Sequence, residues 1–175
     1  MIRLLSFCVW FCVGAVLMVG TASAQSPKSL LKAPSGAWNA YMLREKKGPA
    51  CYMTSRPVST APKGVRRGEI WFLVTHRPKR KVRNEISVYM GYPLKAGKDV
   101  TVVVDKQKSF NLFIDGEIAW GDTEAQEKAL VRAMQKGNRI VVKGLSKRGT
   151  NTSDQYSLKG FTKAYRAISK ACGVK

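Results

Sequence analysis

The chain has 175 residues and carries 31 lysines and arginines against 11 aspartates and glutamates, which gives a formal net charge of +20 at pH 7. This length fits one domain with a real core, because two independent cores would each be marginal. The chain contains one histidine, His76, and no G-x-S-x-G, H-E-x-x-H or phosphate-binding loop, so the usual anchors of hydrolase, zinc and nucleotide-binding sites are missing.

The first 24 residues have the pattern of a secretory signal peptide. Arg3 precedes an apolar run from Leu4 to Val19, and Ala22-Ser23-Ala24 forms a small-residue cleavage site, which predicts cleavage after Ala24. An uncleaved membrane anchor is the alternative, but the apolar run is short for a span. Removal of residues 1–24 takes away one basic and no acidic residue, which leaves 30 basic against 11 acidic residues and a net charge of +19. We therefore expect a periplasmic, cell-surface or secreted protein with no transmembrane span after cleavage.

Two cysteines, Cys51 and Cys172, remain in the mature chain, because Cys8 and Cys12 leave with the signal peptide. Two cysteines in an exported protein usually pair, so we expect a disulfide that closes a loop of about 120 residues. The alternatives are a metal site and a reactive thiol. A metal site would need further histidines or cysteines nearby, and we predict neither a metal nor a cofactor.

Residues 25–35, which include two prolines and two lysines, predict an extended N-terminal leader, and residues 36–175 predict a single domain. Strand patterns dominate this domain, and turn residues such as Gly48-Pro49 and Asp115-Gly116 separate them. The expected strands cover residues 37–43, 50–55, 69–75, 86–90, 100–105, 110–114, 117–120 and 140–142, and one more strand follows the polar turn at 147–151. Short strands at close spacing favour a mainly β domain, an antiparallel β-sandwich or a barrel-like fold.

Two short α-helices are expected among these strands. The first begins at Asp122 or Thr123, both good N-caps, and stops at Gly137. The second starts near Gly160 and is C-terminal; its apolar side chains fall on one helical stripe, namely Phe161, Ala164, Tyr165, Ile168 and Cys172. A cysteine on the buried face of the last turn can reach a strand beneath it, which supports the disulfide.

The last third of the chain has a characteristic order of motifs: Ala119-Trp120-Gly121-Asp122, Lys136-Gly137, Ser146-Lys147-Arg148-Gly149-Thr150, Asp154-Gln155-Tyr156-Ser157-Leu158-Lys159-Gly160-Phe161 and Ala171-Cys172. With the tryptophan and cysteine strands near the start, this block resembles the invasion-associated locus B proteins of alphaproteobacteria. The resemblance implies a small β-sandwich and no established enzymatic activity. It also implies a virulence-associated role in entry into host cells, but only as the label that the family carries. This chain departs from a typical member by being unusually basic.

The densest basic segment lies between two expected strands and contains Arg77, Lys79, Arg80, Lys81 and Arg83. An exposed hairpin tip with this charge would attract a polyanion such as lipopolysaccharide, anionic phospholipid or a glycosaminoglycan. Lys147 and Arg148 occupy a second loop and are candidates for the same role. Nucleic acid is disfavoured, because export removes the chain from the cytoplasm and no nucleic-acid-binding motif is present.

Three other interpretations stay open at this stage. The basic loops could simply be solvated and protect a sheet edge from aggregation. The protein could be a structural or assembly factor of the envelope that acts through a protein partner. Catalysis by His76 with an aspartate or serine is the least favoured, because this histidine ends an expected strand. The preferred prediction is an exported, non-catalytic factor that binds an anionic surface or partner.

Overall fold

The computed structural model of the protein describes residues 26–174. The predicted signal peptide lies outside these residues. Over the described range, eleven antiparallel strands join in one sheet, in the order β1-β2-β3-β5-β6-β9-β8-β7-β10-β11-β4. The strands are β1 (Lys28–Ser29), β2 (Trp38–Glu45), β3 (Gly48–Ser55), β4 (Ser59–Ala61), β5 (Trp71–Arg77), β6 (Val82–Tyr89), β7 (Val100–Val104), β8 (Lys108–Asp115), β9 (Ile118–Trp120), β10 (Arg139–Leu145) and β11 (Asn151–Ser157).

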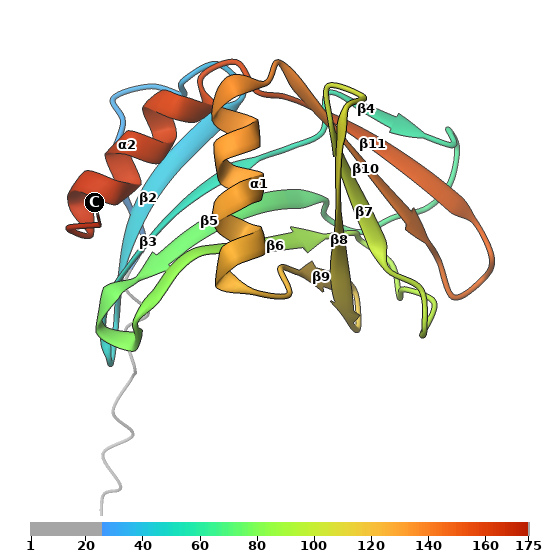
Figure 1. The fold of residues 1–175 in the computed structure, drawn as a ribbon, viewed down its shortest axis with the longest axis horizontal. Helices are drawn as coiled ribbons and strands as arrows, with labels where there is room; N and C mark the ends of the chain where they lie inside the picture. Colours follow the sequence, from blue (N-terminus) through green and yellow to red (C-terminus); the bar gives the residue numbers. More distant parts are fainter. Residues whose placement is uncertain (1–25, 175) are drawn as a thin grey trace, which may run out of the picture.

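The sheet curves around the helix α1 (Glu124–Lys136), as Figure 1 shows. Strand β8 connects the two halves of the sheet, because Lys108–Leu112 pairs with β7 while Phe113–Asp115 pairs with β9. The helix α2 (Phe161–Ala171) packs on β2, β3 and β5, and α1 packs on β6 and β8. Both helices therefore fill the inner face of the curved sheet.

The core follows from the period-two alternation of the strands. Trp38, Phe72 and Phe161 are fully buried and meet edge to face, with Trp38 ring centroids 6.0 Å from Phe72 and 4.9 Å from Phe161. The Trp38 indole N–H donates to the carbonyl of Ser157 at 2.9 Å, which satisfies its polar atom and brings β2 toward the end of β11. This tryptophan is thus a core residue.

Local signals set the helix ends. The Thr123 hydroxyl accepts from the backbone N–H of Gln126 at 3.2 Å, and α1 ends at Gly137. Gly160 begins α2 with φ of 89°, and a side chain at this position would collide with the carbonyl oxygen of Ser35. At the other end of α2, Cys172 forms a disulfide with Cys51 of β3.

The predicted fold class, a mainly β antiparallel domain with two helices of which the second is C-terminal, is confirmed. Two details differ. The short edge strand β4 was not expected, and β1 pairs with β2 from within the segment predicted as a leader. Leu30 and Leu31 of that segment also pack against the core.

Candidate functional site

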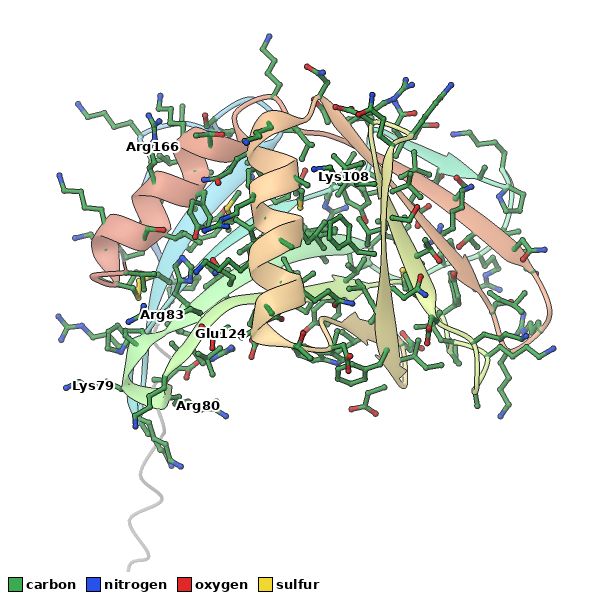
Figure 2. The ribbon with its side chains drawn as sticks, in the orientation of Figure 1. Lys79, Arg80, Arg83, Lys108, Glu124 and Arg166 are labelled. Atoms are coloured by element: carbon green, nitrogen blue, oxygen red, sulfur yellow. A yellow bond between two sulfur atoms is a disulfide. The ribbon has the colours of Figure 1, made fainter. Side chains whose placement is uncertain are left out.

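The connection between β5 and β6 projects from the lower end of the sheet in Figure 1. It consists of the short 3-10 helix η1 (Pro78–Arg80) and of Lys81, which takes the left-handed conformation with φ of 58° and donates its N–H to the carbonyl of Pro78 at 3.0 Å. Lys79, Arg80 and Lys81 are exposed. Figure 2 shows Lys79 and Arg80 reaching away from the body of the protein. This connection is the predicted hairpin tip.

Arg77 differs from its three neighbours because it is held by carboxylates. Its Nε donates to Glu45 of β2 at 3.2 Å and its Nη1 to Glu85 of β6, and its side chain is only 24 % exposed. Its charge is therefore balanced within the protein. Arg77 joins the ends of two hairpins and positions the residues beyond it.

The structure places a second turn beside η1. The chain reverses at Lys46 and Lys47 between β2 and β3, and Gly48 lies directly against the side chain of Lys79. Both turn lysines are exposed. We call the resulting surface the basic tip, and define it as Lys46, Lys47, Lys79, Arg80 and Lys81. Sequence reasoning treated residues 45–49 only as a turn, because the contact between the two hairpins depends on the pairing of β3 with β5.

Arg83 faces a different environment from the basic tip. It lines a pocket of about 320 Å³ at the start of α1, together with Glu85, Glu124 and Glu127. Figure 2 labels Arg83 and Glu124 near one another, beside and at the lower end of α1. Burial first, and then the neighbouring Glu85 and Glu124, raise the pKa of Glu127 to about 7, although its carboxylate accepts the N–H of Ile86 at 2.8 Å. Arg83 therefore lines the same pocket as three carboxyl groups and is not counted in the basic tip.

Lys147 and Arg148 lie in the turn between β10 and β11, at the opposite end of the sheet (Figure 1). They line a groove of about 590 Å³ with Arg66 and Arg67. The seven predicted anion-binding residues thus do not form one patch. They divide between the β5–β6 hairpin and this groove.

His76 is fully buried in β5, one residue before the strand ends. Its Nδ1 accepts the backbone N–H of Asn84 at 3.1 Å, so Nε2 carries the proton and donates to the Ser169 hydroxyl at 3.1 Å. In this tautomer the ring cannot take a proton from Ser169. Burial, followed by the charge of Arg83, lowers the pKa of His76 to about 4. His76 thus links β5 to β6 through Asn84 and to α2 through Ser169.

The described residues 26–174 contain no group of three or more His, Cys, Asp or Glu side chains that could hold a metal ion. Within the same range, no helix is both long enough and apolar enough to cross a membrane.

Sequence reasoning missed the buried ion pair between Arg67 and Asp154, whose side chains are 7 % and 1 % exposed. The only signal in the sequence is the Arg66-Arg67 doublet, which does not indicate a buried carboxylate partner. The two partners lie 87 positions apart, so no local pattern links them.

Comparison with known proteins agrees with this architecture. A model of the family described as "Invasion associated locus B (IalB) protein" matches residues 38–169. The fold is similar to the crystal structure of invasion associated protein B from Bartonella henselae, with a TM-score of 0.60 and 17 % sequence identity over 81 % of this chain and 97 % of that one. No curated protein matches the chain. Since the family model spans the domain from β2 into α2, the chain belongs to the invasion associated locus B (IalB) family.

Proposed function

We propose that this IalB family protein is an exported, non-catalytic factor that binds an anionic component of the envelope or of a host surface through the basic tip. The observation that carries the proposal is the convergence of two turns: Lys46 and Lys47 lie beside Lys79, Arg80 and Lys81, and all five side chains are exposed. Each basic side chain near an anionic membrane contributes about 1 kcal/mol. Five together are enough for reversible, salt-sensitive binding.

The geometry of the surrounding residues supports the proposal. Arg77 is neutralised by Glu45 and Glu85, so it fixes the hairpin while the exposed cations beyond it remain available. The candidate partners are lipopolysaccharide, anionic phospholipid and glycosaminoglycan, and the proposed location is the periplasm or the cell surface. A contribution to host-cell interaction would follow from a host glycosaminoglycan as the partner.

The test uses the mature protein, residues 25–175, and vesicles of phosphatidylcholine with or without phosphatidylglycerol or lipopolysaccharide. The tip variant is Lys79→Glu/Arg80→Glu/Lys81→Glu. The matched control, Lys159→Glu/Lys163→Glu/Arg166→Glu, changes the net charge equally with three exposed side chains just before α2 and in its first half. Figure 2 shows Arg166 far from Lys79 and Arg80.

We expect the wild type and the control variant to sediment with anionic vesicles at low salt and to be released as salt increases. Loss of three contacts of about 1 kcal/mol each weakens binding roughly a hundredfold, and charge reversal weakens it further. Equal binding by all three proteins at every salt concentration would show that the basic tip is merely solvated.

A protein partner is the second candidate function, and one observation favours it. On the outer face of the sheet, Tyr89 and Phe113 are 38 % and 46 % exposed. They lie on either side of β9, where Tyr89 pairs with Ile118 and Phe113 pairs with Trp120. An envelope assembly factor could use such a surface. Crosslinking in cells should then recover one stoichiometric protein partner, and Phe113→Ser should abolish the crosslink; a crosslink that persists in the variant would remove this candidate.

A further inference from the structure

The groove at the β10–β11 end of the sheet is formed by three chain segments. Its walls come from Val65 to Arg67, from Gly91 to Pro93, and from the turn Ser146 to Thr150. Its volume is about 590 Å³, within the range of pockets that hold small ligands. The β10–β11 turn, which supplies one of its walls, lies at the far end of the sheet from the β5–β6 connection (Figure 1).

A buried ion pair fixes the first wall. Arg67 donates from Nη1 and Nη2 to the two carboxylate oxygens of Asp154, each at 2.7 Å, and Nε and Nη2 also donate to the carbonyl of Met90 at 3.1 and 2.7 Å. Its guanidinium lies 4.9 Å from the centroid of the Tyr92 ring. Four of the five N–H groups of Arg67 are therefore used within the protein. Arg67 is a positioning residue that holds Arg66 at the rim.

Backbone hydrogen bonds fix the opposite wall. The N–H of Lys147 donates to the carbonyl of Pro93 at 2.8 Å, and the N–H of Ser146 donates to the carbonyl of Thr150 at 2.9 Å. Two residues after Pro93, the N–H of Lys95 donates to the carbonyl of Leu145, the last residue of β10, at 2.9 Å. Both walls are thus held before any ligand arrives, which reduces the entropic cost of binding.

The free charge of the groove is positive. Arg66, Lys147 and Arg148 line it and are exposed, and Glu117 is the one carboxylate among its lining residues. Arg67 also lines the groove, but Asp154 balances its charge. Three cations against one anion leave two unbalanced positive charges. Two of the cations are guanidinium groups, whose planar forks match the oxygen atoms of phosphate and sulfate.

We propose that this groove binds a saccharide of one or two rings that carries a phosphate or sulfate ester. Arg66 and Arg148 contact the ester oxygens, and the ring lies along Pro93 and the Thr150 hydroxyl. A nucleic-acid strand would need exposed aromatic faces for stacking, but Tyr92 is only 9 % exposed and Arg67 covers its ring. A lipid chain would need a continuous apolar floor, and the charged side chains of Arg66, Lys147 and Arg148 interrupt this lining.

The site is separate from the basic tip, and its test can fail or succeed independently. Mature wild-type protein is titrated with N-acetylglucosamine 6-phosphate, N-acetylglucosamine 6-sulfate, N-acetylglucosamine and inorganic phosphate, and binding is followed by backbone amide shifts in NMR spectra. The groove variant is Arg66→Gln/Arg148→Gln, and the control at the tip is Lys79→Gln/Arg80→Gln. All four substituted side chains are exposed, so both variants should fold.

We expect at least one sugar ester to bind more tightly than the neutral sugar and inorganic phosphate, with shifts centred on residues 146–150. The groove variant should bind the ester at least about tenfold more weakly, because charge-assisted hydrogen bonds are lost, and the tip variant should bind it normally. Preference for the phosphate points to lipopolysaccharide sugars, and preference for the sulfate points to sulfated glycans. Lys147→Gln alone should give a smaller loss, which keeps the test valid if the double variant is unstable.

Three results would overturn the proposal: no binding of either ester, equal binding of ester and inorganic phosphate, or equal loss in the tip and groove variants. Vesicle binding distinguishes the two sites, since the groove variant should keep it. Absence of vesicle binding in every protein would refute the proposed function of the tip and leave the saccharide titration unaffected.

Discussion

The disulfide between Cys51 and Cys172 should contribute a large share of the stability of this domain. The two residues are 121 positions apart, so the bond closes a loop that spans most of the domain. In the chain-entropy model, a loop of this length restricts the unfolded state by about 5 kcal/mol at 25 °C. We expect Cys51→Ala/Cys172→Ala to lose about that amount.

Thermal and urea unfolding of the oxidised wild type and the double variant measure the loss directly. For a domain of this size, about 5 kcal/mol corresponds to a Tm lower by roughly 10 to 20 °C. Added reductant should act slowly on the folded wild type, because Cys51 is fully buried and Cys172 is only 7 % exposed. A fully unfolded sample with reductant is therefore needed to open the bond before refolding.

Two results would refute this reasoning. The first is titration of two free thiols in the native oxidised protein. The second is a double variant whose midpoint of urea unfolding equals that of the wild type at the same slope, since this would show that the loop closure contributes nothing.

Three further predictions follow from buried ionisable groups. The imidazole of His76, the single histidine of the chain, should titrate near pH 4, as followed by the NMR signals of its ring. Because the unfolded chain binds the proton at higher pH than the folded protein does, the protein loses stability through this group as pH falls from 6.5 to about 4. A midpoint near 6.5 would contradict the burial of the ring. Glu127 has a folded pKa above its unfolded value of 4.5, so its ionisation costs stability as pH rises toward 7. Glu127→Gln should therefore stabilise the protein at pH 8 by about 1 kcal/mol after allowance for solvent screening and leave it unchanged at pH 4. Urea unfolding at both pH values measures this, and a variant that is stabilised at pH 4 but not at pH 8 would contradict it. Arg67→Ala should lower the free energy of unfolding by about 3 to 5 kcal/mol, because Asp154 is left buried without a partner. Arg67→Met/Asp154→Leu should lower it much less, because no buried charge remains. Similar losses in both variants would show that side-chain packing, not charge, dominates.

Local patterns were enough to predict most elements of the fold. The alternation of apolar residues predicted the strands, and Thr123 and Gly137 marked the ends of α1 within two residues. The apolar stripe of α2 also predicted that Cys172 faces the core, and the structure pairs it with Cys51. The strands and helix ends depend on residues that are close in sequence. The disulfide could be predicted because the mature chain has only two cysteines, which allow a single pairing.

Features that depend on strand order could not be predicted. The basic tip forms because β3 pairs with β5, which brings Lys46 and Lys47 beside Lys79, and neither turn carries a signal for the other. The same reason explains why Arg77 was predicted as a free cation: its partners, Glu45 and Glu85, come from two different strands. The charge of a loop was visible in the sequence, whereas its neutralisation was not.

The most direct test of the account is to map the contact surface of the mature protein on anionic membranes. Backbone amide signals are compared in free protein and in protein bound to small bilayer discs of phosphatidylcholine with phosphatidylglycerol, which carries no sugar ester for the groove. Broadening should be confined to residues 45–48 and 78–82, and it should disappear in Lys79→Glu/Arg80→Glu/Lys81→Glu. Broadening centred on the outer face around Phe113 and Tyr89, with the tip unaffected, would contradict it.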